Sequence, residues 1–150
     1  MIDMRDVGVR VLVGDLASEE LPMVAAQALA EGLDSPSLRE LAGLSRGDYR
    51  EARELLDQVV HELGLPELPD EEQAVWEVVA SYARRVVSGA ITPVDGAHAI
   101  AAFGGSLGFP EPLATFAYLA DLWEDNAAER AQLEQEIERE AEALLRDVGD

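Results

Sequence analysis

The sequence predicts an all-α protein, folded as a compact single-domain bundle of six or seven helices over residues 1–150. Apolar residues recur three or four positions apart along most of the chain, which is the spacing of one face of an α-helix. Glycine and proline interrupt this spacing at intervals of about 10–20 residues, as they do between helices. We expect the long helices over residues 47–63 and 71–88 to form the central pair of the bundle.

The first segment of the chain fits two kinds of structure. Val7, Val9, Val11 and Val13 alternate with other residues, which is typical of a strand. No other segment alternates in this way to supply a partner strand, and Met4, Val7 and Val11 also share one helical face. We favour a helix over residues 4–14, and the alternative is a strand that pairs with its copy across a dimer.

The boundaries of the remaining helices follow from capping and breaking residues. Candidate N-terminal caps are Ser18, Ser35, Ser45, Asp70, Thr92 and Asn126. Gly64 and Gly89 are expected to end the two long helices. The helix over residues 47–63 has an apolar stripe of Tyr49, Ala52, Leu55, Leu56, Val59, Val60 and Leu63. Helices are therefore expected over residues 18–30, 36–43, 47–63, 71–88, 93–103, 112–125 and 127–147.

The composition excludes several classes of protein. The chain carries 31 acidic and 11 basic side chains, a formal charge of −20, and it has neither lysine nor cysteine. This charge opposes direct binding to nucleic acid or to anionic membranes. The lack of cysteine excludes disulfides, a thiol nucleophile and cysteine-bound metals. No apolar run approaches the roughly 18 residues of a membrane span, and Met1–Asp6 lacks a signal-peptide pattern. We expect a cytoplasmic protein without a cofactor.

Two segments carry a resemblance to known sequences. Residues 30–43 are AEGLDSPSLRELAG, and residues 83–97 are ARRVVSGAITPVDGA. They are similar to runs that recur in small, all-helical hypothetical proteins of high-GC bacteria, and the lack of lysine fits the coding bias of such genomes. The matching residues are helix caps and turns, so the resemblance implies a helical fold and a bacterial origin, and it implies no activity.

A group of acidic residues is expected at the end of the helix over residues 112–125. Asp121, Glu124 and Asp125 lie three and four positions apart, so they share one side of the helix end. The helix dipole disfavours acids at a C-terminus, so this group needs compensation. A bound divalent cation, a facing arginine such as Arg130, or solvent alone can supply it.

The glycine-rich segment before that helix is the most irregular part of the chain. Its sequence, GGSLGFP over residues 104–110, follows a helix in an acidic region, which does not fit a phosphate-binding loop. Leu107 and Phe109 either fill the core between two helices or stand exposed as a contact patch. We count both residues, together with Asp121, Glu124 and Asp125, as candidate protein-binding residues.

Two further features allow a functional and a structural interpretation. Asp95 precedes His98 by three positions, so the pair can share a helix face and hold a metal or exchange a proton; Asp95 also suits the first turn of a helix. The helix over residues 127–147 has a narrow apolar stripe of Leu133, Ile137, Ala141, Leu144 and Val148. This stripe either packs on its own domain or forms half of a dimer seam.

The sequence favours a non-catalytic, acidic protein-binding or regulatory module that recognises a basic protein partner. Immunity proteins, antitoxins and nucleic-acid mimics use the same physics, because clustered carboxylates speed association with basic surfaces. One alternative is a structural or accessory helical homodimer. The other is a metal-assisted enzyme that uses His98, Asp95 and the acidic group at residues 121–125.

Overall fold

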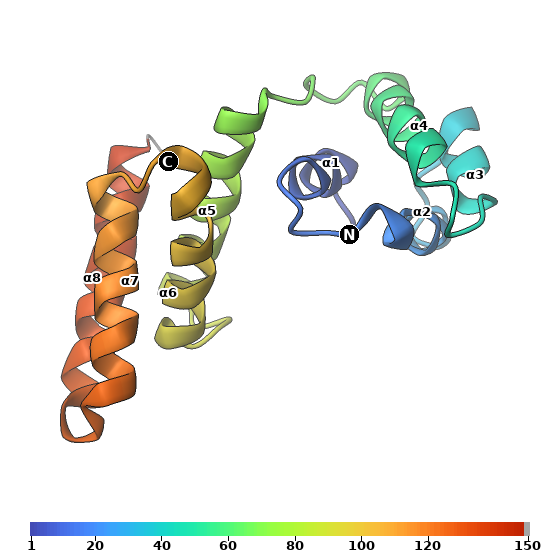
Figure 1. Ribbon diagram of the computed structural model, residues 1–150. Helices are drawn as coiled ribbons and strands as arrows, with labels where there is room; N and C mark the ends of the chain where they lie inside the picture. The colour runs from blue at the N-terminus through green and yellow to red at the C-terminus, as the bar shows by residue number, and fades with distance from the viewer. Residues whose placement is uncertain (149–150) are drawn as a thin grey trace. The chain divides into compact units, whose positions relative to one another are not determined.

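The computed structural model describes residues 1–148, which contain eight α-helices and no strand (Figure 1). The all-α fold class is confirmed. The predicted number of six or seven helices is too low: the favoured helix at residues 4–14 and all seven helices expected over residues 18–147 have counterparts, which makes eight. Within the described part of the chain, no helix combines the length and the apolar character needed to cross a membrane.

The chain divides into two compact units, Met1–Ala74 and Val75–Asp150, and each is described by itself. The single domain over residues 1–150 stays a prediction. The two helices expected to form a central pair fall on different sides of this division, since the first belongs to unit 1 and most of the second to unit 2. Neither unit therefore contains the expected pair.

Unit 1 contains four helices: α1 (Met4–Leu12), α2 (Leu21–Ala30), α3 (Pro36–Ala42) and α4 (Tyr49–Glu62). A 3-10 turn, Ser18–Glu20, leads into α2. Helix α3 packs against both α2 and α4, and α1 packs against α4. Their shared core consists of Met4, Val7, Val11, Leu21, Ala25, Ala28, Leu38, Leu41, Ala52, Leu55, Leu56 and Val59.

The first segment is the helix α1 and not a strand. Asp3 caps it, since its Oδ1 accepts a hydrogen bond of 2.9 Å from the backbone N–H of Arg5. Met4, Val7 and Val11 occupy one face of α1 and are buried in the core of unit 1. The strand pairing across a dimer is therefore wrong, because the segment is helical and buries Val7 and Val11 within its own unit.

Unit 2 contains the helices α5 (Glu71–Ser88), whose first residues lie in unit 1, α6 (Pro93–Ala102), α7 (Glu111–Asp125) and α8 (Arg130–Asp147). Helices α6, α7 and α8 all contact one another and lie side by side (Figure 1). Leu133, Ile137, Ala141 and Leu144 of α8 are buried, whereas Val148 is exposed. The stripe on α8 thus packs on its own unit, and this face is not free to form a dimer seam.

A close contact joins α5 and α6 at a glycine. A methyl group built on Gly96 would lie only 2.1 Å from Cγ2 of Val86 and 3.3 Å from Cδ1 of Ile91. Gly96 and Val86 are both buried. Glycine at this position lets the two helix backbones approach more closely than any other residue would allow.

The helix ends show which capping predictions hold. Ser35 and Thr92 accept hydrogen bonds from backbone N–H groups of α3 and α6, as expected, and Asp70 does the same for α5. Ser45 and Asn126 do not cap. The Ser45 hydroxyl donates instead to the Asp48 carboxylate, and the Asn126 side chain donates back to a carbonyl of α7.

Candidate interaction surface on α7

Helix α7 has one buried side and one exposed side. Leu113, Phe116, Leu119 and Ala120 are buried against the rest of unit 2. The exposed residues Glu111, Ala114, Tyr118, Asp121 and Asp125 follow one another at intervals of three or four positions. With 3.6 residues per turn, they form one continuous stripe opposite the buried side. We call this stripe the outward face of α7.

Tyr118 lies in the middle of the outward face, and 62 % of its surface is exposed. It is a residue that the sequence interpretation missed. The signal was available, because Tyr118 lies out of phase with the apolar spacing of Leu113, Phe116 and Ala120 on the same helix. An exposed aromatic residue on this face of the helix is a candidate contact residue.

The predicted acidic group lies at the C-terminal end of α7, and its members have different environments. The Glu124 carboxylate lies within hydrogen-bond distance of His98 of α6, with Oε1 3.2 Å from Nε2, and accepts when Nε2 carries the proton. Within residues 1–148, the side chains of Asp121 and Asp125 make no hydrogen bond and no ion pair. These two carboxylates are exposed at the helix end where the dipole is also negative, so their charge has the same sign as the dipole there.

Arg130 compensates the end of α7, but it does so through the backbone. Its Nε donates to the carbonyl of Trp123 at 2.9 Å, and its Nη2 lies 3.4 Å from the carbonyl oxygen of Glu124. The guanidinium also stacks on the Trp123 ring, 4.0 Å from the centroid. Arginine is thus the compensation found here, and it leaves the carboxylates of Asp121 and Asp125 to the solvent.

Phe109 is exposed and does not fill the core. Its exposed fraction is 63 %, whereas Leu107 is half-buried. Phe109 has a positive φ of 53°, directly after Gly108 with a φ of 74°. Its backbone N–H donates to Gly104 at 2.7 Å, and its ring lies over Gly104, with Cδ1 3.1 Å from the position of a Cβ built on that glycine. The core-filling interpretation is wrong for Phe109, because this left-handed backbone turns the ring onto the outside of the loop.

The five predicted contact residues do not form one cluster. Leu107 and Phe109 precede α7, whereas the acidic group is at its other end, about 20 Å away for a helix with a rise of 1.5 Å per residue. Tyr118 lies between them on the outward face. A protein interface of ordinary size, about 800 Å² on each partner, can span this distance.

The residues of the metal hypothesis are only partly brought together. His98 and Glu124 are in contact, and Asp95 lies one turn before His98 on α6. Asp95 lies in the first turn of α6, after the Thr92 cap, where an acidic side chain interacts favourably with the helix dipole. Among the described residues, no group of three or more histidine or acidic side chains is arranged to hold a metal ion.

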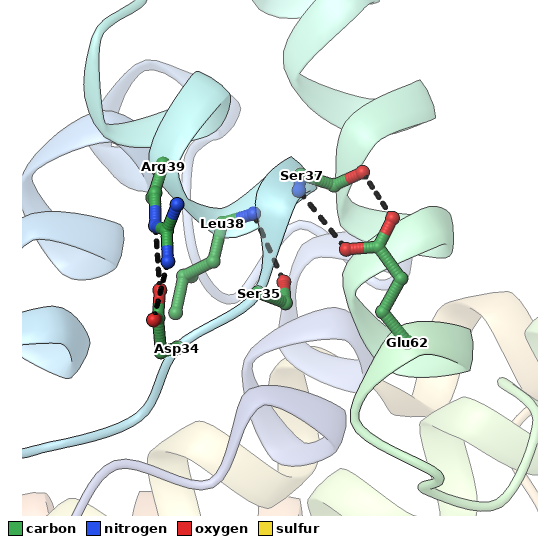
Figure 2. A network of polar contacts seen from close by, with 6 residues as sticks. All are labelled: Asp34, Ser35, Ser37, Leu38, Arg39 and Glu62. Atoms are coloured by element: carbon green, nitrogen blue, oxygen red, sulfur yellow. Dashed lines mark hydrogen bonds and ion pairs between the residues drawn. The ribbon is translucent and has the colours of Figure 1, made fainter.

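A second polar network lies in unit 1, between α3 and α4 (Figure 2). The Ser37 hydroxyl donates to Glu62 Oε2 at 2.6 Å, and the Ser37 backbone N–H donates to Glu62 Oε1 at 2.9 Å. The hydrogen bond from the Ser37 hydroxyl, and to a smaller extent that from the backbone N–H, lowers the pKa of the Glu62 carboxyl. Ser37 is buried, so this network fastens the start of α3 to α4 and offers no accessible nucleophile.

A salt bridge completes the polar contacts at α3. Arg39 and Asp34 pair through two hydrogen bonds of 2.8 and 2.6 Å, and Figure 2 shows both. The hydrogen bond from Arg39 lowers the pKa of Asp34. Both side chains are exposed, so the pair adds little to stability.

Comparison with known proteins gives no match to this chain, whether with a protein-family model, a curated protein or a solved structure.

Proposed function

We propose that this chain is a non-catalytic binding module that recognises a basic protein through the outward face of α7. The observation that carries the proposal is an exposed tyrosine on the same helix face as two exposed carboxylates that form no ion pair within residues 1–148. Tyr118 supplies a large, rigid contact area, and Asp121 and Asp125 have no ion pair within the described residues. Tyrosine is among the residues that contribute most to binding energy at interfaces.

Electrostatics supports a basic partner. Both units are acidic: residues 1–74 carry 17 acids and 6 arginines, and residues 75–150 carry 14 acids and 5 arginines, charges of −11 and −9. A field of one sign accelerates association with an oppositely charged surface and makes binding sensitive to salt. A protein of this kind would regulate its partner by occupying a basic site with its acidic face, as immunity proteins, antitoxins and nucleic-acid mimics do. We place this interaction in the bacterial cytoplasm.

The two surfaces from which the sequence suggested a homodimer give no support to that alternative. Val7 and Val11 of α1 belong to the core of unit 1, and Leu133, Ile137, Ala141 and Leu144 of α8 are buried.

The experiment that tests the proposal is affinity capture with matched variants. Tagged protein is incubated with lysate of the source organism, eluted by a salt step and analysed by mass spectrometry. Tyr118→Ala and the double variant Asp121→Asn/Asp125→Asn alter the outward face of α7. Tyr49→Ala, at a tyrosine that is also exposed, and Glu138→Gln/Glu142→Gln, at two exposed acids of α8, are the controls.

We expect a basic protein that is captured by the wild type and by both controls, and that is lost or strongly reduced with both α7 variants. Equal capture by all five proteins would place the binding elsewhere or assign it to charge alone. Recovery of the tagged protein by itself would contradict the proposal.

A further inference from the structure

Helix α2 of unit 1 is apolar on both of its sides. Its sequence, LPMVAAQALA, contains no charged residue, although 28 % of the whole chain is charged. Leu21, Pro22, Ala25 and Ala28 are buried on the inner side. The outer side carries exposed residues that include Met23, with 66 % of its surface exposed, and Ala26. Apart from Gln27, the exposed outer side is apolar, and exposed apolar surface of this kind is typical of an interaction site.

A groove runs along this outer side. Its volume is about 520 Å³, and its lining comes from α2, from Leu16 and the 3-10 turn before α2, and from Ala42 and Arg46 at the end of α3 and after it. Ligand-binding pockets commonly have volumes of about 300–1,000 Å³. The residues of α2 that line the groove run from Pro22 to Gln27, so the groove follows more than one turn of the helix. Met23 can adapt to different occupants because its side chain is unbranched and flexible.

The rim of the groove carries charges that are free to pair. Glu19 and Glu20 lie at one end, in the 3-10 turn, and Arg46 is contributed by the loop after α3. The side chains of these three residues form no hydrogen bond or ion pair with any residue between 1 and 148. The groove therefore combines an apolar floor with two unpaired carboxylates and one unpaired guanidinium.

We infer that the groove along α2 binds an amphipathic, basic helix of a partner protein. An apolar face of such a helix would cover Met23 and Ala26, and its basic side chains would pair with Glu19 and Glu20; this is the usual way in which a helix is recognised by a groove. A second copy of this chain is a poor occupant, because each copy carries a charge of −20 and would repel the other. The inference rests on α2 and does not depend on the outward face of α7.

The test uses the full chain and a pair of synthetic peptides as probes. One peptide has leucine at positions i, i+3, i+4 and i+7 and arginine on its other face, and the second has the same composition in scrambled order. Fluorescence anisotropy of labelled peptides gives both dissociation constants at physiological salt. The variants of the groove are Met23→Glu, Ala26→Glu and Glu19→Gln/Glu20→Gln. The controls are Tyr118→Ala and Glu51→Gln/Glu54→Gln, which removes the same charge from exposed positions of α4.

The wild type is expected to bind the amphipathic peptide about tenfold or more tightly than the scrambled one, as burial of even one large apolar side chain provides. Met23→Glu and Ala26→Glu should abolish this preference, and Glu19→Gln/Glu20→Gln should weaken binding of the amphipathic peptide more than Glu51→Gln/Glu54→Gln does. Both groove positions are exposed, so the fold should persist, and circular dichroism verifies it.

Three results would overturn the inference. Equal binding of both peptides would assign the interaction to charge alone. Loss of the preference in Tyr118→Ala, with Met23→Glu unaffected, would place the peptide on α7. Failure of the peptide to bind, together with a change from dimer to monomer in Met23→Glu, would make a second copy the occupant.

Discussion

Replacement of Gly96 by alanine tests the close packing of α5 on α6. The new methyl group would lie 2.1 Å from Cγ2 of Val86, well inside contact distance. Val86 is buried and β-branched, and a β-branched residue in a helix has one strongly preferred rotamer, so its methyl cannot easily turn away. Such overpacking costs about 1–3 kcal/mol, and we expect the upper part of this range because of the short separation. Alanine returns about 1 kcal/mol through its better helix propensity.

The net expectation for Gly96→Ala is a loss of about 1–2 kcal/mol in the free energy of unfolding. Val86→Ala alone removes two buried carbon atoms and should cost about 2 kcal/mol. In the double variant the methyl at position 96 occupies space vacated by Val86, so the two changes should compensate by about 1–3 kcal/mol relative to their sum. Urea unfolding followed by circular dichroism measures all four proteins. Additive effects, or a Gly96→Ala variant more stable than the wild type, would refute the predicted contact.

Three more predictions concern single polar contacts. Glu62→Gln should lower the urea midpoint at neutral pH. Because Ser37 lowers the native pKa of Glu62, the stabilisation by the Glu62 carboxylate is present above about pH 4.5 and disappears as the pH falls below the native pKa. A difference between variant and wild type that stays constant down to pH 3 would contradict the hydrogen bonds between Ser37 and Glu62. Arg130→Ala should lower the free energy of unfolding by about 1–2 kcal/mol and alter the change in Trp123 fluorescence on unfolding. Arg130→Lys should recover only part of this stability, since lysine has no planar group that stacks and donates at once. Full recovery by lysine would show that charge alone matters. Thr92→Ala should cost about 1 kcal/mol through loss of the N-cap of α6, whereas Thr92→Ser should be close to wild type, and equal losses in the two variants would exclude the hydroxyl as the cause.

The sequence was informative where one short-range contact decides the structure. Ser35, Asp70 and Thr92 were identified as caps from their positions before helical segments, and each accepts the expected backbone hydrogen bond. Ser45 failed because α4 begins at Tyr49 with Asp48 at its cap position, and the Ser45 hydroxyl donates to the Asp48 carboxylate instead. Local competition of this kind depends on side-chain rotamers, which the order of residues does not specify.

The apolar pattern predicted burial well within helices and poorly at their ends. Tyr49 fitted the stripe of its helix, yet it is the first residue of α4 and 59 % of its surface is exposed. For Phe109 the sequence left core filling and exposure open, and its positive φ directs the ring outward. Whether an end residue meets a neighbour depends on where the adjacent helices terminate, and that is a property of the tertiary structure.

At the candidate site too, the sequence predicted the positions along one helix and not the contacts between groups. The sequence located the acidic group of α7 and left a bound cation, a facing arginine such as Arg130 and solvent as its possible compensation; Arg130 does lie at that helix end. It could not show that Arg130 binds backbone carbonyls and leaves Asp121 and Asp125 unpaired. The sequence grouped His98 with the acidic residues 121–125 only as possible metal ligands; the direct contact of His98 with Glu124, 26 positions away, comes from the packing of α6 on α7.

Photo-crosslinking at position 118 tests the central claim most directly. A benzophenone-bearing amino acid replaces Tyr118 in one protein and the exposed Tyr49 in a matched control, and both are irradiated in lysate at low and at high salt. The outward face of α7 predicts a crosslink from position 118 to a protein rich in arginine and lysine, formed at low salt, diminished at high salt and absent from position 49. A crosslink of equal strength from both positions, or a partner at position 118 without an excess of basic residues, would contradict the claim.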